Sequence, residues 1–184
     1  MIDYILVRSE RKSLGIEIKN GQVTVRAPKR LPQKQIDAFV AEKEAWIRAH
    51  LEKSAAASAE ARQAGMLSLE EIRALADEAL RMIPARVAYY APRVGVTPGR
   101  VTIRNQKSKW GSCSSKGNLN FNCLLMLTPP EVLDSVVVHE LCHLKEMNHS
   151  PRFYAEVRRV FPDYDKWDRW LKEHGAAIMR RMTG

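Results

Sequence analysis

The chain has 184 residues, 45% of them hydrophobic, which fits one full-sized soluble domain or a compact domain with an N-terminal extension and excludes a disordered or fibrous protein. Its net charge of +9 predicts a surface that attracts polyanions, although a basic surface that only aids solubility would explain the charge equally well. No run approaches the roughly 18 apolar residues of a membrane span, and the first residues lack the apolar core of a secretory signal, so we expect a cytoplasmic protein.

The N-terminal part of the chain predicts a β-hairpin followed by a helix. Apolar residues alternate along residues 14–28, and Asn20-Gly21 in the middle of this run favours a tight turn. After Pro32 the apolar spacing becomes helical as far as Leu51. The small residues that follow, 54–65, are either a continuation of this helix or a linker. We therefore expect a first domain over residues 1–65 and a second over residues 66–184, either separate or packed as one unit.

The middle of the chain predicts a long helix and two strands. Ser68 and Glu71 have the spacing of a capping box, so a helix should begin there and run to about Tyr90, with Pro84 favouring a kink. Strand-like runs follow over residues 101–110 and 118–127, and a turn-rich segment separates them.

The C-terminal third predicts three helices. Thr128 and Glu131 repeat the capping-box spacing before the first of them. Ser150 caps the second, which ends near Val160, and the last is expected over residues 164–182.

The first of these helices carries the motif HELCH, which predicts a metal site. Residues i and i+4 lie on the same face of a helix, so His139 and His143 can direct imidazole nitrogens at one ion. Glu140 lies at the edge of that face, where it can take a proton from a metal-activated water without binding the metal. We expect Zn²⁺ or another divalent transition metal. Buried, hydrogen-bonded helix residues are the alternative reading of an isolated motif.

A third ligand is needed, and several residues after the motif are candidates. A helix rises about 10.5 Å over seven residues, so Glu146 cannot reach an ion held by the first histidine. Cys142 points to another side of the helix and is read as a small buried residue. His149 is preferred, because a turn at residues 147–148 can bring its ring back to the ion. Glu156 on the following helix is the alternative.

These residues resemble the YgjP-like family of predicted metal-dependent hydrolases, which is related to the SprT-like zinc metalloproteases. The resemblance covers nearly the whole chain. Its most specific segments are KSKWGSCSSKGNLNFN (107–122), LTPPEVLDSVVVHELCHLKEMNHSPRFY (127–154) and FPDYDKWDRWL (161–171). In that family the metal ligands fall on the positions of His139, His143 and His149, and the catalytic glutamate falls on Glu140.

The resemblance implies an α+β fold with a zincin-like metallopeptidase core, in which a small mixed sheet packs on the HExxH helix and the N-terminal hairpin and helix form an extension. The run 118–127 is the expected edge strand above the cleft, with which an extended peptide could pair. The loop at 110–117 would border the site, unless it is only a turn with Trp110 as a core anchor. The expected substrate contacts are Asn120, Ser112, Lys116 and Tyr164.

Three classes of function follow. The first is a zinc-dependent metallopeptidase with Glu140 as general base and Tyr164, Tyr154 or Arg152 stabilising the oxyanion; its partner would be a protein or peptide, including DNA-associated protein. The second is a metal-dependent nucleotide hydrolase that uses the basic surface. The third is a nucleic-acid or protein-binding module with a structural metal, whose fourth coordination position a protein ligand would close.

Overall fold

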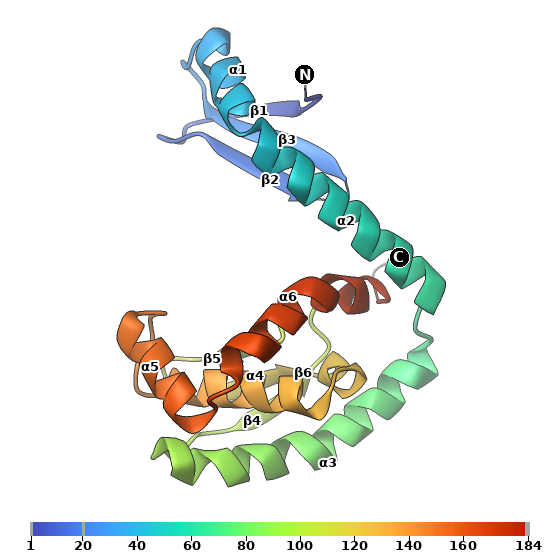
Figure 1. The fold of residues 1–184 in the computed structure, drawn as a ribbon, viewed down its shortest axis with the longest axis vertical. Helices are drawn as coiled ribbons and strands as arrows, with labels where there is room; N and C mark the ends of the chain where they lie inside the picture. The colour runs from blue at the N-terminus through green and yellow to red at the C-terminus, as the bar shows by residue number, and fades with distance from the viewer. Residues whose placement is uncertain (1, 20, 183–184) are drawn as a thin grey trace. The chain divides into compact units, whose positions relative to one another are not determined.

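The structure is a computed structural model that describes residues 2–19 and 21–182. These residues contain six α-helices and two three-stranded sheets, so the chain has the α+β fold that the sequence predicts (Figure 1). They form two compact units, residues 1–60 and 61–184, which are described in turn. A domain boundary at residue 65 stays a prediction.

A mixed sheet forms the first unit, with the strands in the order β1-β3-β2. Its strands are β1 (Ile5–Ser9), β2 (Gly15–Lys19) and β3 (Gln22–Pro28). β2 and β3 form the predicted antiparallel hairpin. In the turn Gly21 has φ 76°, a conformation that favours glycine, whereas Asn20 lies outside the described residues. β1, which pairs in parallel with β3, is a strand that the sequence did not predict.

The helical segment after this sheet is two helices rather than the one predicted. α1 (Gln33–Glu42) ends at Lys43, and α2 (Glu44–Ala64) begins at the next residue. Neither Gly nor Pro stands at this break, so no residue in the sequence signals it. Residues 54–64 continue α2, so the small-residue stretch is helical up to that point. The core of the unit consists of apolar side chains from β3, α1 and α2: Val23, Val25, Ala27, Ile36, Val40 and Ile47.

α3 (Leu69–Val94) opens the second unit with the predicted capping box. The Ser68 hydroxyl accepts a hydrogen bond from the Glu71 N–H at 3.1 Å, and the Glu71 carboxylate accepts one from the Ser68 N–H at 2.7 Å. The helix continues through Pro84 and ends at Gly95, which adopts the left-handed conformation with φ 79°.

The second sheet has the strand order β4-β6-β5, with β6 in the centre. β6 (Leu119–Asn122) pairs in parallel with β4 (Val101–Arg104) and antiparallel with β5 (Gly111–Cys113). β5 falls in the segment predicted as turn-rich. The sheet lies against α4 (Pro130–Cys142), the helix that carries the HELCH motif (Figure 1).

Two predictions about residues 118–127 are wrong. The strand ends at Asn122, and the apolar residues after it form the 3₁₀-helix η1 (Cys123–Leu127). The Asn122 side chain caps η1 by accepting a hydrogen bond from the Leu124 N–H at 3.1 Å, which favours the helical turn over further extension. The strand is also not at an edge, because both sides of β6 are paired, so a peptide cannot add to it. The edge strands of this sheet are β4 and β5.

The predicted capping box at Thr128 is also wrong. The Thr128 hydroxyl donates to the Leu125 carbonyl at 2.8 Å, at the end of η1, and α4 begins after Pro129 without a side-chain cap. By contrast, Ser150 caps α5 (Pro151–Val160) as predicted, accepting from the Phe153 N–H at 3.2 Å. The last helix is α6 (Tyr164–Arg180).

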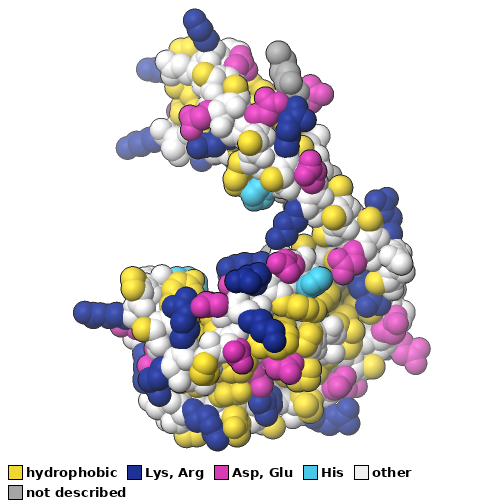
Figure 2. Space-filling model, in the orientation of Figure 1, with side chains coloured by type: hydrophobic (Ala, Val, Ile, Leu, Met, Phe, Trp, Pro, Cys, Tyr) yellow, Lys and Arg dark blue, Asp and Glu magenta, His cyan; other side chains and the backbone are white. Residues whose placement is uncertain are grey.

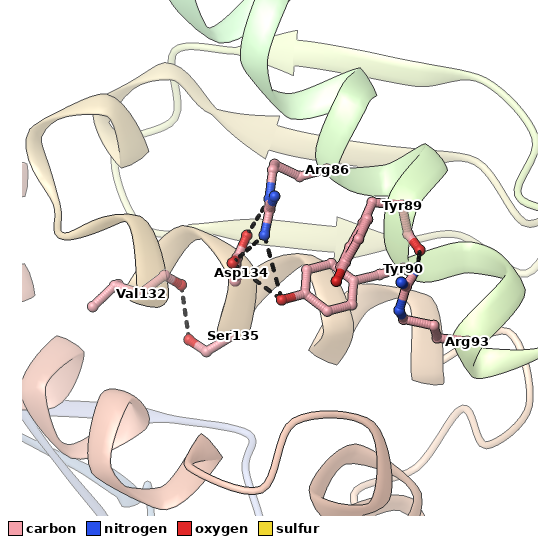
Figure 3. A network of polar contacts seen from close by, with 7 residues as sticks. All are labelled: Arg86, Tyr89, Tyr90, Arg93, Val132, Asp134 and Ser135. Atoms are coloured by element: carbon pink, nitrogen blue, oxygen red, sulfur yellow. Dashed lines mark hydrogen bonds and ion pairs between the residues drawn. The ribbon is translucent and has the colours of Figure 1, made fainter.

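A polar network ties α4 to α3 (Figure 3). Nε of Arg86 donates to Oδ1 of Asp134 at 2.6 Å, and the Tyr90 hydroxyl donates to Oδ2 at 3.1 Å. Asp134 is only 9% exposed, and these two partners, one cationic and one neutral, offset the loss of hydration of its carboxylate. The network, together with the apolar residues of α4 that are buried on all sides, fixes the helix that carries the motif.

The two ends of the second unit are joined by hydrogen bonds. The Leu67 N–H donates to the Arg181 carbonyl at 2.9 Å, and Nε of Arg181 donates to the Gly65 carbonyl at 3.0 Å. The segment before α3 therefore lies beside the C-terminal end of α6.

The face drawn in Figure 2 has no large patch of charge of a single sign. In Figure 2, Lys and Arg side chains alternate with Asp and Glu side chains in both units. Of the helices in the described part of the chain, none combines the length and the apolar character that a membrane crossing requires.

Candidate metal centre

Three histidine nitrogens converge at the C-terminal end of α4. Nε2 of His139 lies 3.2 Å from Nε2 of His143 and 3.0 Å from Nε2 of His149. Zinc bound tetrahedrally through bonds of about 2.0–2.1 Å would separate two such nitrogens by about 3.4 Å. These two separations are within a few tenths of an ångström of that value, and the three ligand atoms all lie within 4.8 Å of one another, so the donor set suits a zinc-sized ion. Within the described residues, these three are the His, Cys, Asp and Glu side chains grouped closely enough to hold a metal.

The end of α4 brings the third histidine into place. The helix stops at Cys142, and His143 is its C-cap residue. The chain then turns, with the Glu146 N–H donating to the Cys142 carbonyl at 3.0 Å, and bends at residues 147–148, where the sequence predicts a turn. His149 follows immediately, so its ring reaches the other two from outside the helix.

Hydrogen bonds at the opposite ring nitrogens orient two of the histidines. Nδ1 of His143 lies 3.1 Å from the Glu146 carbonyl oxygen. Because a carbonyl oxygen only accepts, this Nδ1 carries the proton and Nε2 keeps its lone pair for a metal. Nδ1 of His139 lies 2.8 Å from the Tyr164 hydroxyl. Glu146 thus supports the site through its backbone, and its carboxylate is not in the histidine cluster.

A buried aromatic ring packs among the three histidines. The centroid of Phe153 lies 4.8 Å from that of His139, 4.5 Å from that of His143 and 5.0 Å from that of His149. Phe153 is fully buried. Sequence reasoning missed this residue. Its only signal was its position on the first turn of the helix that follows the third histidine.

The surroundings keep the imidazoles uncharged. Burial, together with the neighbouring His143 and His149, lowers the pKa of His139 to about 3. Burial also lowers the pKa of His143. Both rings are therefore neutral at pH 7, which is the form that binds a metal ion.

Glu140 is buried beside the histidines, with 6% of its surface exposed. Burial raises the pKa of its carboxyl group to about 7, against an opposing effect of Lys109. The carboxylate lines a pocket of about 220 Å³ together with His139. The other walls come from the loop before β5, from α4 and from α6, and include Lys109, Trp110, Val136, Asp168 and Leu171. Sequence reasoning named none of these except Trp110, because they meet only in the folded chain.

The predicted substrate contacts are divided between two regions. Tyr164 lines the pocket, but its hydroxyl contacts His139. Ser112 and Asn120 pair across β5 and β6, with Nδ2 of Asn120 3.3 Å from Oγ of Ser112. Neighbouring Gly111 faces Glu140, so the alternation of a strand puts the Ser112 and Asn120 side chains on the opposite face of the sheet. Lys116 is exposed in the turn after β5.

Of the other candidates, Glu156 and Cys142 are not among the grouped ligand atoms, whereas Tyr154 contacts one of the histidines. The Glu156 carboxylate accepts hydrogen bonds from Lys145 at 2.6 Å and from Arg159 at 2.7 Å, and these bonds lower its pKa to about 2. Cys142 is buried, which raises the pKa of its thiol to about 12. The Tyr154 ring stacks on His149 with centroids 6.0 Å apart.

A family model described as YgjP-like, metallopeptidase domain, matches residues 12–76 and 70–174 of the chain. Two solved structures are similar to part of it. The metallopeptidase zymogen abylysin of Pyrococcus abyssi is 26% identical, with 50% of this chain and 93% of that chain covered and a TM-score of 0.45. The metallopeptidase zymogen jannalysin of Methanocaldococcus jannaschii is 24% identical, with 50% and 95% covered and a TM-score of 0.45. A comparison with curated proteins gave no match.

Proposed function

Because the chain belongs to the YgjP-like metallopeptidase family and is therefore a metal-dependent hydrolase, we propose that it is a zinc-dependent peptidase. In this proposal His139, His143 and His149 hold the ion, and Glu140 is the general base. The substrate is a protein or peptide.

One observation carries the proposal: three imidazole Nε2 atoms converge beside a buried carboxylate at the wall of a pocket. Zinc hydrolases use three protein ligands and leave the fourth position for water or substrate. Here the described cluster has three members, which favours a catalytic site over a structural one closed by a fourth side chain.

The ion, when bound, would polarise the scissile carbonyl and lower the pKa of a water molecule. The residues of the chain supply the rest. Glu140 takes the proton of the attacking water and passes it to the leaving amine. Tyr164 and the Glu146 carbonyl hold the rings of His139 and His143.

The substrate would be held by the sheet and the pocket. β5 is the edge strand whose first residue, Gly111, lies against Glu140, so an extended peptide pairing with β5 would pass the base. The pocket accepts a side chain next to the scissile bond. Its walls of Trp110, Val136 and Leu171 suit an apolar side chain better than a polyphosphate. This favours a peptide over the nucleotide alternative.

The test compares the zinc-loaded protein with Glu140→Gln on an unfolded protein and on a peptide library. Glutamine keeps the size of glutamate but cannot accept the proton, so turnover should fall by about 100- to 10,000-fold while the zinc content stays the same. Unchanged turnover would exclude Glu140 as the base. His149→Ala should sharply lower the zinc content in elemental analysis, and full occupancy there would exclude His149 as a ligand.

A further inference from the structure

Gly111, the first residue of β5, lies where any side chain would collide with Glu140. A Cβ atom built on Gly111 would lie 2.6 Å from Oε1, 2.7 Å from Cγ and 2.9 Å from Cδ of Glu140. Carbon atoms in contact normally lie about 3.5–4.0 Å apart. The collision involves Cγ as well as the carboxylate, so turning the end of the glutamate would not relieve it.

Glycine is needed at this position because there is no room for a side chain, and not because of the backbone conformation. The four glycines with positive φ among the described residues are Gly21, Gly65, Gly95 and Gly117. Gly111 is not one of them, so alanine could adopt its backbone conformation. Glycine is depleted in β-strands, and the contact with Glu140 explains its presence in β5.

The Glu140 carboxylate is held by packing rather than by hydrogen bonds, and Lys109 attracts it without an ion-pair contact. Among the described residues it has no hydrogen-bond or ion-pair partner, although only 6% of the residue is exposed. Its position therefore depends on the walls around it, and the backbone of β5 at Gly111 is one of them.

Asn122 fixes this wall. Its side-chain amide donates to the carbonyl oxygens of Gln106 at 2.7 Å and Lys109 at 2.9 Å, and its backbone N–H donates to the Trp110 carbonyl at 2.8 Å. Asn122 is completely buried. The backbone just before Gly111 is thus anchored at three points and cannot easily move away from an added methyl group.

We propose that Gly111 is a positioning residue for Glu140: the space left by its missing side chain is the seat that holds the carboxyl group in place. The consequence for catalysis rests on the proposed function, in which Glu140 is the base. A misplacement of about 1 Å can cost on the order of 100-fold in rate, so an occupied seat should slow the chemical step without weakening substrate binding.

The first experiment tests the seat without any enzymatic assay. The thermal midpoints of wild type, Gly111→Ala, Glu140→Ala and the double variant are compared by calorimetry. In the presence of Glu140, Gly111→Ala should lower the midpoint by about 3–8 °C, as overpacking does. In the Glu140→Ala background it should lower it by less than about 1 °C, because the colliding atoms are gone.

An equal loss in both backgrounds would overturn the proposal, since the methyl group would then collide with something other than Glu140. If Gly111→Ala alone fails to fold, recovery of folding in the double variant supports the seat, and failure of both variants overturns it.

The second experiment tests the consequence for catalysis. In zinc-loaded Gly111→Ala, kcat should fall at least about tenfold, with KM within about twofold of wild type and the zinc content unchanged. Gly15→Ala is the matched control, because Gly15 also lies in a strand and an added methyl would meet only the flexible end of Arg11. It should change none of these quantities. An unchanged kcat, or a loss confined to KM, would overturn the positioning role.

The two proposals fail in different ways. If Gly111→Ala lowers the thermal midpoint only when Glu140 is present, but Glu140→Gln retains full turnover, then the seat is real and Glu140 is not the base. If Glu140→Gln is inactive but Gly111→Ala lowers the midpoint equally with and without Glu140, the proposed function stands and the role assigned to Gly111 is wrong.

Discussion

The hydroxyl group of Tyr164, the first residue of α6, lies 2.8 Å from Nδ1 of His139 on α4. This contact joins two helices at the candidate metal centre and directs Nε2 of His139 towards the other two histidines. Partners of this kind fix the orientation of a metal-binding ring and raise its affinity for the metal.

Tyr164→Phe should therefore weaken zinc binding by about 10- to 100-fold, as the loss of such partners does. Competition with a chromophoric chelator measures this affinity. Tyr89→Phe is the control, because Tyr89 is exposed on α3 and lies away from the site, and its zinc affinity should equal that of wild type. An unchanged affinity in Tyr164→Phe would show that the contact does not orient His139.

Phe153→Ala should remove the common packing surface of the three histidine rings. We expect a loss of about 3–5 kcal/mol in the free energy of unfolding, together with weaker zinc binding. Phe121→Ala separates the two effects, because Phe121 is equally buried in the same core but has no ring contact with a histidine among the described residues. Urea denaturation and zinc titration of both variants give the comparison. Equal zinc affinities in the two would argue against a role for Phe153 at the site.

Leu171→Trp should narrow the pocket beside Glu140. Cleavage of peptides with a large apolar side chain next to the scissile bond should fall at least about tenfold, while peptides with glycine or alanine there should be cut as before. Mass spectrometry of the products from a peptide library measures this preference. Leu80→Trp, a substitution on the exposed side of α3, is the control. A uniform loss over all peptides would show that the pocket does not select the side chain.

The ion pairs of Glu156 should make stability depend on pH in the acid range. Hydrogen bonds from Arg159 and Lys145 lower its pKa from the ordinary 4.5 to about 2 in the folded protein. The folded state thus favours the ionised carboxylate, and this stabilisation is complete above pH 4.5 and is lost as the pH falls through 2. Glu156→Gln should be less stable than wild type by about 1 kcal/mol at pH 7, after screening by solvent, and equally stable below pH 2. Urea midpoints measured across this range give the difference. If the stability difference between wild type and Glu156→Gln were the same at all pH values, the ion pairs of Glu156 would not be its cause.

The sequence predicted the parts of the fold that depend on local chemistry. The capping box at Ser68, the cap at Ser150 and the hairpin ending at Pro28 were all predicted and are confirmed, because each depends on residues close together in the chain. The box at Thr128 failed, since its hydroxyl had a competing partner in the turn before it. The expected edge position of the run 118–127 failed for a similar reason, because the tertiary fold decides which strands pair.

The same distinction applies to the candidate site. The three histidines could be proposed from spacing, because two lie one helical turn apart and the third follows a short turn. The contacts of Phe153 and Tyr164 could not, because α5 and α6 meet α4 only after packing. Gly111 was placed only within the loop 110–117 that the resemblance puts at the border of the site, since nothing in the sequence shows that its backbone passes Glu140.

The hydrogen bonds between Arg181 and the segment at Gly65 and Leu67 hold the two ends of the second unit next to each other. A domain whose N-terminal and C-terminal ends lie side by side can be inserted into a surface loop of another protein without distorting either fold. Residues 65–182 are therefore suited to insertion into another protein as a unit. The same closeness of the ends suits the unit to circular permutation, in which the present ends are linked and new ends are made elsewhere. The exposed turn at Lys116, between two short strands, is one place to cut.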